Sequence, residues 1–353
     1  MRMLWTETNR TGLTALIACG AALSLSCAGS LKGLPVDKEG RCFPCTSEAC
    51  DEPLEITTLG AAGYVFVRGS DTIVVDPFFS NPSLLRVGLH LTIESDRETV
   101  LEYMPDLPSA SAILVGHTHY DHLLDVPIVA REKAPNATIY ASETGKNILS
   151  AFGLHTEPLD GEKVTEVKVS ERVIFRAVPS EHAPHLLGHT LMEGEYDEPQ
   201  TKPPRSAFDW RGGPTFAFAI DFLASDGTTD FRVLVHDSAA RPGVGLPPAD
   251  LERARIRVAI PCVASFSQVD NYPATLIARF APDYIVFGHW EDFFTPYSQS
   301  YEKVRTVRLT DVAGFMKVVS DLTDAPSTLP LPGSKIRIAR DCPISPAAPE
   351  QSR

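Results

Sequence analysis

Residues 111–125 read SAILVGHTHYDHLLD, and this stretch decides the fold. The apolar letters AILV predict a buried strand, and the glycine after them ends it. His117 and His119 stand two residues apart, so an extended backbone points both rings in one direction. Asp121 and the adjacent His122 can turn towards a second centre. The stretch therefore predicts a loop that supplies ligands to two neighbouring metal ions.

Ligand-type side chains also follow other predicted strands. His182 follows the strand expected over 172–178, Asp237 the strand over 231–235, and His289 the strand over 284–287. Where strands lie side by side, their ends converge on one rim of a sheet. We therefore expect these three side chains to join the histidine-rich loop in one cluster.

The pattern of elements runs twice along the chain, with strands first and then strands alternating with helices. Strands are also expected over residues 54–67, 72–79, 137–141, 163–169, 215–222, 256–263 and 335–338, and helices over 94–103, 126–133, 144–152, 273–280 and 304–320. This order predicts an α/β fold in which two mixed sheets pack face to face with helices outside. Residues 80–108 and 186–214 lack a clear period, so we expect a surface insertion and a lid or substrate wall.

The first 27 residues differ from the rest of the chain. Two arginines flank a polar start, and the small, apolar run that follows is too short for a comfortable membrane span. We expect an export signal over residues 1–27, with a buried N-terminal helix as the alternative. A cysteine just past the apolar run resembles a bacterial lipoprotein signal, with Cys27 or Cys19 acylated. The expected location is therefore the periplasm, or the membrane of a bacterial envelope through that lipid.

The body of the chain divides into a cysteine-containing linker (28–53), a main domain (54–340) and a C-terminal tail (341–353). Its cysteines are Cys42, Cys45, Cys50, Cys262 and Cys342. Export favours disulfides, one of them between the N-terminal segment and Cys342, although the connectivity cannot be read from the sequence. The number is odd, so at least one thiol stays free, and we expect it to be a buried Cys262.

The chain is acidic, with 45 Asp and Glu against 32 Lys and Arg and a formal net charge of −13. Such a surface repels a polyphosphate backbone, and the sequence contains no Lys/Arg run. We therefore exclude a nucleic-acid partner and expect a small-molecule or lipid substrate. The oligomeric state is left open.

The letters HTHYDH at 117–122, with the later histidines and aspartate, resemble the metallo-β-lactamase superfamily. The segments VDPFFS (75–80), VPSEH (178–182) and GHW (288–290) are most similar to its N-acylphosphatidylethanolamine phospholipase D-like and L-ascorbate-6-phosphate lactonase-like branch. The resemblance implies a four-layer αβ/βα sandwich, which agrees with the order of elements above.

The resemblance also implies a ligand set, carried over residue by residue. It places His117, His119 and His182 on metal one, Asp121, His122 and His289 on metal two, and Asp237 between the two. The family usually has Gly-Asp-Thr or Gly-Asp-Ser at the bridge, where this chain has His236 before Asp237. His236 is then either a packed ring or a partner of a ligand. Nitrogen and oxygen ligands without cysteine suit two divalent ions, zinc first and also manganese or iron.

The chemistry implied by the resemblance is hydrolysis. Two cations that share a water lower its pKa, so a metal-bridging hydroxide can attack without a protein nucleophile. Asp121 would also orient this nucleophile. His185 or His189 would protonate a leaving group, or both are simply loop histidines. Asp76 either orients a ligand histidine or caps a turn.

These expectations combine into an exported, binuclear metal-dependent hydrolase of a phosphodiester or lipid-like substrate, or of a lactone. A β-lactamase of the same fold is the first alternative. A non-catalytic metal-binding protein of the same fold is the second, and the complete set of ligand-type residues argues against it.

Overall fold

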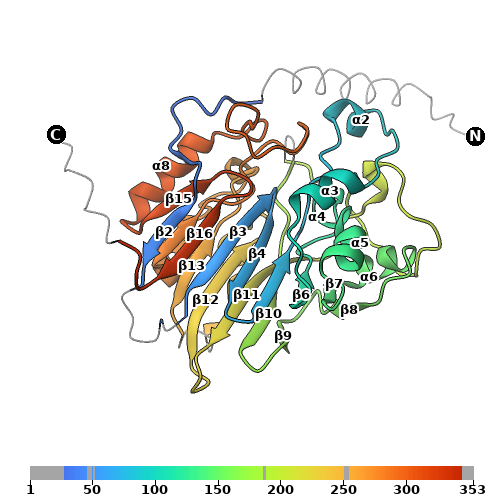
Figure 1. Cartoon of the computed structure of the whole chain (residues 1–353). Helices are drawn as coiled ribbons and strands as arrows, with labels where there is room; N and C mark the ends of the chain where they lie inside the picture. Colours follow the sequence, from blue (N-terminus) through green and yellow to red (C-terminus); the bar gives the residue numbers. More distant parts are fainter. Residues whose placement is uncertain (1–27, 46–49, 51, 186–187, 250–253, 344–353) are drawn as a thin grey trace, which may run out of the picture.

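The structure is a computed structural model that describes residues 28–45, 50, 52–185, 188–249 and 254–343. Two sheets lie face to face, and helices cover their outer faces (Figure 1). The expected α/β fold with two mixed, packed sheets is therefore confirmed. The export signal, with Cys27 and Cys19, and most of the C-terminal tail lie outside the described residues. Within those residues, no helix has the length and apolar content that a membrane crossing requires.

The first sheet has eight strands in the order β2-β16-β3-β4-β5-β6-β7-β8. They are β2 (Arg41–Pro44), β16 (Lys335–Ala339), β3 (Leu54–Gly60), β4 (Gly63–Arg68), β5 (Asp71–Val75), β6 (Ala110–Leu114), β7 (Thr138–Ser142) and β8 (Thr156–Leu159). Strands β3 to β5 pair antiparallel, whereas β5 to β8 run parallel. The histidine-rich loop follows the carboxyl end of β6, which belongs to this parallel half of the sheet.

The second sheet also has eight strands, in the order β1-β15-β14-β13-β12-β11-β10-β9. They are β1 (Val36–Asp37), β15 (Ser327–Pro330), β14 (Tyr284–Val286), β13 (Ile256–Ile260), β12 (Thr229–His236), β11 (Thr215–Leu223), β10 (Val173–Ser180) and β9 (Thr165–Lys168). Strands β12, β13 and β14 are parallel, so their carboxyl ends share one edge.

Short helices complete the outer layers. The helices are α2 (Leu84–Gly88), α3 (Arg97–Tyr103), α4 (Tyr120–Leu123), α5 (Val126–Ile128), the π-helix η1 (Val129–Lys133), α6 (Glu143–Ser150), α7 (Ala274–Phe280) and α8 (Val312–Leu322), with 3-10 turns η2 (Ala207–Asp209) and η4 (Phe266–Gln268). Figure 1 shows α3 to α6 on the first sheet and α8 on the opposite side of the molecule. Residues from β5, β6 and α3 to α6 share one apolar cluster, and residues from β12 to β15, α7 and α8 share another.

The alternation of side chains along each strand explains the four layers. In β5, Ile73 and Val75 point into the cluster between the sheets, whereas Val74 points towards the helices. In β11, Phe218 enters the same inter-sheet cluster, whereas Ala219 faces α7 and α8. Central strands such as β5 and β11 are thus buried on both faces, which is why the sequence shows continuous apolar runs there rather than a polar face.

Three expected elements differ from the structure. The strand expected over 54–67 is two strands, because a turn at Ala61, with φ 46°, reverses the chain. The helix expected over 304–320 starts only at Val312, since Leu309 adopts φ 57° and Asp311 caps the helix by accepting from the Gly314 amide at 2.9 Å. The third difference is that the helix α2 and the strands β8 and β15 lie in segments where the sequence predicted no helix or strand.

The segment expected to be a linker adds edge strands to both sheets. β1 pairs with β15 and β2 pairs with β16. A disulfide joins Cys42 to Cys342, so the N-terminal segment is tied to the C-terminal end as expected. A second one joins Cys45 to Cys50, and Cys262 is a buried free thiol.

Candidate metal centre

The histidine-rich loop lies between β6 and α4, at the edge of the first sheet. Backbone angles of φ −63° and ψ 158° keep His119 extended, which turns the two first rings towards one another as the spacing predicted. Gly116 allows the second sheet to approach, because a Cβ at this position would lie 2.3 Å from Cγ of Asp237. The close approach of Asp237 therefore depends on a glycine before the motif.

The strand ends do converge. His182 follows β10, Asp237 follows β12 and His289 comes shortly after β14. Three groups of potential ligand atoms lie within 4.8 Å of one another: His117 with His119 and His182, His117 with His122 and Asp237, and Asp121 with His122 and His289. The structure thus brings together all seven side chains that the resemblance assigned as ligands.

In the first group, the inner nitrogens of the rings face one another. Nε2 of His117 lies 2.9 Å from Nδ1 of His119. Their outer nitrogens have acceptors: Nδ1 of His117 donates to the Asp237 carboxylate, and Nε2 of His119 donates to the Met192 carbonyl at 3.3 Å. Nδ1 of His182 donates to the Ala183 carbonyl at 2.6 Å. Oxygen acceptors on the outer nitrogens are the arrangement that orients metal-binding imidazoles.

These hydrogen bonds fit a cation in the first group. Because a carbonyl or carboxylate oxygen can only accept, each outer nitrogen carries the proton, and a neutral ring then has a lone pair on its inner nitrogen. Two lone pairs 2.9 Å apart, on His117 and His119, repel each other unless a cation binds both. Burial lowers the pKa of both rings, which favours the neutral form that a metal requires.

In the second group, one carboxylate oxygen faces two rings. Oδ2 of Asp121 lies 3.5 Å from Nε2 of His122 and 3.5 Å from Nε2 of His289. All three side chains are buried. His289 holds a left-handed backbone at φ 51°, a strained conformation for a residue with a side chain. The backbone is thus bent so that this ring reaches the group.

Two further carboxylates lie behind the loop. Oδ1 of Asp237 lies 2.8 Å from Nδ1 of His122, while its Oδ2 accepts from His117. Oδ1 of Asp76 accepts from the Gly116 amide at 2.8 Å, and its Oδ2 lies 3.4 Å from Nδ1 of His122. Asp76 therefore both holds the turn and faces a ligand-type ring. Asp237 contacts the outer nitrogens of two rings rather than their inner ones.

The electrostatics of the centre also fit cations. Asp76, Asp121 and Asp237 are all buried in it. Although burial raises the pKa of Asp121, contact with His122 and His289 holds it well below its usual range, so the carboxylate is charged. Although burial lowers the pKa of His122, Asp237, Asp121 and Asp76 together raise it. Burial and the neighbouring Asp237 raise the pKa of Asp76 well above its usual range, so the negative charge lies on Asp121 and Asp237. Buried negative charge is costly without positive partners, and divalent ions would supply them.

Comparison with known proteins finds a similarity for part of the chain. Residues 71–222, which include the histidine-rich loop, match the Beta-lactamase superfamily domain. This segment is similar to that domain over less than half of the chain, and it contains five of the seven candidate ligands. The similarity agrees with the two packed eight-stranded sheets and with the grouped histidines and aspartates. A comparison with curated proteins found no match.

Solved structures with a similar arrangement have low sequence identity to this chain. Igni18, a metallo hydrolase from Ignicoccus hospitalis, is 16% identical, with a TM-score of 0.49 over 81% of this chain and 98% of its own. The metallo-beta-lactamase fold protein YhfI from Bacillus subtilis is 13% identical, with a TM-score of 0.46 over 81% of this chain and 99% of its own. An isothiocyanate hydrolase from Delia radicum gut bacteria is 13% identical, with a TM-score of 0.46 over 80% of this chain and 98% of its own.

The two histidines expected as proton donors are placed differently. The ring of His185 stacks on His182, with ring centroids 4.5 Å apart. Its Nδ1 accepts from the Leu191 amide at 2.9 Å, so Nε2 carries the proton of the neutral ring. Burial lowers the pKa of His185 to about 4. His189 is exposed and contributes its backbone carbonyl to the His185 amide, so the structure favours His185 over His189 at the centre.

The ring before Asp237 is packed in the core, which is one of the two roles that the sequence left open. His236 is buried beside Tyr272, with ring centroids 5.9 Å apart. Neither ring nitrogen has a hydrogen-bond partner in the described part of the chain, and burial lowers the pKa of His236 to about 4.

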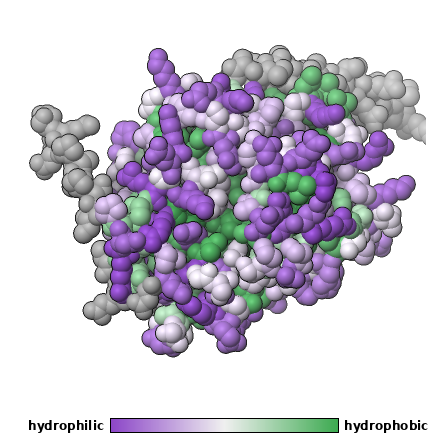
Figure 2. Space-filling model, in the orientation of Figure 1, coloured by the Kyte–Doolittle hydropathy of each residue, from purple (hydrophilic) through white to green (hydrophobic). Residues whose placement is uncertain are grey.

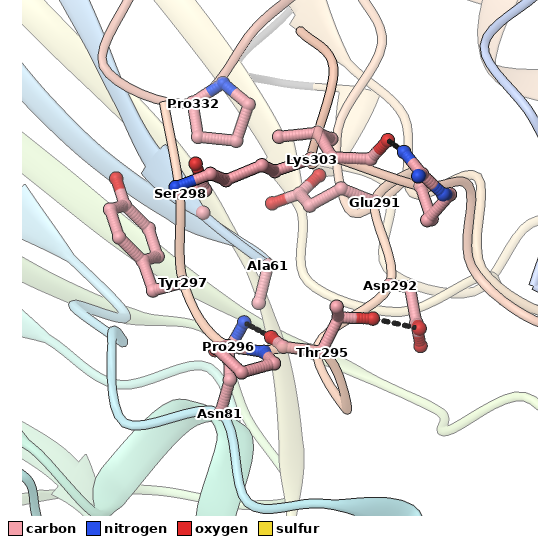
Figure 3. Close-up of a pocket in the computed structure, with 13 residues that line it drawn as sticks. Ala61, Asn81, Glu291, Asp292, Thr295, Pro296, Tyr297, Ser298, Lys303 and Pro332 are labelled. Atoms are coloured by element: carbon pink, nitrogen blue, oxygen red, sulfur yellow. Dashed lines mark hydrogen bonds between the residues drawn. The ribbon is translucent and has the colours of Figure 1, made fainter. Parts of the chain in front are cut away.

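Two pockets near the centre differ in size. One of about 360 Å³ opens beside His119 and His182, under the wall of residues 190–194. Another, of about 20 Å³, lies beyond His289, and Figure 3 shows Glu291, Tyr297 and Lys303 around it. A space of about 15 Å³ already holds one water, so the second pocket is too small for a substrate. The pocket beside His119 and His182 has room for a small-molecule substrate next to the candidate ligands.

The sequence did not reveal how the wall of residues 186–214 joins the centre. Gly212 accepts from the Thr118 amide at 2.9 Å, and its own amide donates to Met192 at 2.9 Å. The Met192 carbonyl therefore receives hydrogen bonds from both Gly212 and His119. A Cβ at 212 would lie 2.9 Å from Nε2 of His119. The pair of glycines at 212 and 213 was the one signal in the sequence for this close approach.

Proposed function

We propose that the chain is an exported binuclear hydrolase of phosphodiester bonds in lipid-like substrates. The observation that supports it is the arrangement of two adjacent groups, with His117 and His119 presenting lone pairs in one and Asp121 facing two rings in the other. Two divalent ions, zinc first and otherwise manganese or iron, would supply Lewis acidity and lower the pKa of a water that they share. Export, and attachment through Cys27 or Cys19, remain part of this proposal.

The chain's own residues position the reactants. Asp121 is charged and lies between the rings of His122 and His289, so it can accept a hydrogen bond from the attacking water. The Nε2–H of His185, beside His119 and His182, can donate to the leaving oxygen. Asp237 fixes the tautomer of His117 by accepting a hydrogen bond from its Nδ1, and its other oxygen lies 2.8 Å from Nδ1 of His122. A substrate in the pocket beside His119 would lie next to His119 and His182 of the first group.

The surface of the insertion supports a lipid-like substrate. Leu85, Leu89 and Leu91, on and after α2, are between 46% and 60% exposed. Figure 2 shows a hydrophobic area at the upper right, over α2, in addition to one near the middle of the same face. Neighbouring exposed leucines favour contact with acyl chains or a lipid surface. The Asp76 to Ser80 segment and Trp290 also match the phospholipase D-like and lactonase-like branch that the sequence resembles.

A lactone is the second candidate substrate, and one observation favours it. The residues that line the 360 Å³ pocket include no Lys or Arg among the described residues, so nothing there except the metal ions would attract a phosphate. A neutral ester has no need of such a cation.

The test is a hydrolysis panel on protein whose metal content has been measured. It contains phosphodiesters, lactones, a thioester and a chromogenic cephalosporin, and compares the wild-type protein with His119→Ala. Phosphodiester turnover that His119→Ala abolishes supports the proposal. Turnover of the cephalosporin alone would replace it by a β-lactamase, and equal rates for both proteins would assign the activity to a contaminant.

A further inference from the structure

The 360 Å³ pocket carries acidic side chains on its open side. Its lining includes the carboxylates of Glu181 and Glu193, together with the hydroxyls of Ser180, Thr190 and Thr215. None of the described lining residues is a lysine or an arginine. The pocket that adjoins the metal centre is therefore acidic, and its charge affects which charged groups a bound substrate can have.

The two carboxylates differ in how they are balanced. Glu181 forms a forked pair with Arg241, in which Nε donates to Oε2 at 2.7 Å and Nη2 donates to the other oxygen. Glu193 has no ion-pair or hydrogen-bond partner in the described part of the chain, and its side chain is exposed. Glu193 is thus the side chain whose charge is free to act on a bound group.

The wall around Glu193 does not supply a cation to the pocket. Glu195, Asp197 and Glu198 follow it and are all exposed. The nearby Arg211 guanidinium stacks on the Tyr196 ring at 4.5 Å and donates to the Glu195 carbonyl at 2.7 Å, outside the pocket lining. The exposed carboxylates at 193, 195, 197 and 198 thus outnumber the guanidinium beside this part of the wall.

We propose that this pocket selects the part of the substrate that carries a positive charge, an ammonium group on the alcohol portion of a phosphodiester. The proposal rests on the proposed phosphodiesterase function and names its substrate class. The negative phosphate would face the metal ions, which balance it. The rest of the molecule would extend beneath the wall, where Glu193 attracts an ammonium group and repels a carboxylate.

Three substrates that differ in the charge of one arm test this preference, and the cationic and neutral arms have the same shape. The substrates are p-nitrophenyl phosphorylcholine, the same ester with a neutral 3,3-dimethylbutyl arm, and one with an anionic 3-carboxypropyl arm. We expect metal-loaded wild-type protein to prefer the choline arm over the neutral arm by about 10-fold in kcat/KM, and the neutral arm over the anionic arm by a similar factor. Added salt should reduce both ratios.

Two variants with the same change of charge separate the pocket from the rest of the surface. In Glu193→Gln, the preference for the choline arm should fall to about 2-fold or less. In Glu39→Gln, the ratio should equal the wild-type ratio, because this exposed residue lies between β1 and β2, at the sheet edge opposite β9 and β8. Equal rates for all three arms, or a ratio that Glu193→Gln leaves unchanged, would overturn the proposal.

Binding distinguishes its failure from that of the proposed function. If no arm is hydrolysed, calorimetry compares phosphorylcholine with 3,3-dimethylbutyl phosphate on the same metal-loaded proteins. Tighter binding of phosphorylcholine that Glu193→Gln removes would keep the charge selection and discard the phosphodiesterase. Equal binding of the two would discard the charge selection itself.

Discussion

Replacing Gly212 by alanine should weaken the first metal position without touching the second. Position 212 has no positive φ, so alanine suits its backbone, and the effect comes from the added methyl group alone. That carbon would lie 2.9 Å from Nε2 of His119, where ordinary contacts lie at 3.4–4 Å. Either the ring or the wall has to move by about half an ångström or more.

The magnitude follows from what the ring does. His119 donates through Nε2 to the Met192 carbonyl at 3.3 Å, and the opposite nitrogen faces His117. Moving the ring breaks the outer hydrogen bond, and such outer partners contribute about 10–100-fold to metal affinity. A metal-ligand distance also tolerates only about 0.2 Å. We therefore expect Gly212→Ala to lose about 10–100-fold in affinity at the first position.

Zinc content measures this directly. Wild-type and variant proteins are dialysed against buffers of defined free zinc, and zinc per chain is determined by mass spectrometry. Where the wild-type protein holds two ions, Gly212→Ala should hold about one, because Asp121, His122 and His289 do not contact Gly212. Gly88→Ala is the matched control, since a Cβ there would meet no atom within 4 Å.

One result would refute the reasoning. If Gly212→Ala binds two ions with wild-type affinity, the ring of His119 is not held by the wall. Thermal melting provides the check on folding, because overpacking costs about 1–3 kcal/mol and should leave the transition cooperative. A variant that melts normally yet binds metal as the wild type does would leave no other reading.

Three further predictions follow from single contacts. Asp237→Asn leaves one oxygen for the two ring nitrogens that the carboxylate faces, so it should lower metal affinity about 10–100-fold while two ions still bind at saturation. Saturation at one ion would instead identify Asp237 as a ligand that bridges the two ions. Burial raises the pKa of Cys262 to about 12, so at pH 8 its thiolate is about a thousand-fold scarcer than that of an ordinary thiol. A thiol reagent should therefore modify Cys262 only after the protein unfolds. Rapid labelling of the folded protein would contradict this. Cys342→Ser opens a loop of 300 residues closed by Cys42 and should lower the free energy of unfolding by about 2–5 kcal/mol in denaturant titration, and an unchanged midpoint would show that the bond contributes nothing.

Much of the centre could be predicted because its signal is local. The candidate ligands come shortly after apolar runs, and β10, β12 and β14 run in one direction, so their carboxyl ends share an edge of the second sheet. The spacing of His117 and His119 also predicted that their rings converge, and the two rings do face each other. Nothing beyond the order of residues was needed for this step.

Other elements could not be predicted because their causes are not local. Val304 and Val307 are buried and mimic the spacing of a helix, yet the segment is extended: Thr306 pairs with Gly29 and Glu291, residues far from it in the sequence. β1 has only two residues, too few for any period. The start of α8 could have been recognised at Asp311, because aspartate is a common N-cap residue and its carboxylate caps this helix.

Two adjacent residues of the wall connect metal binding with substrate choice. The Met192 carbonyl accepts a hydrogen bond from His119, and no residue pattern reveals a contact made by a backbone atom. The next residue, Glu193, lines the pocket. Because these two residues are adjacent, any displacement of the wall that frees His119 also moves the carboxylate that meets the substrate. Gly212→Ala should therefore change the preference among differently charged substrates as well as the zinc content, whereas a substitution at Glu193 should change only the former.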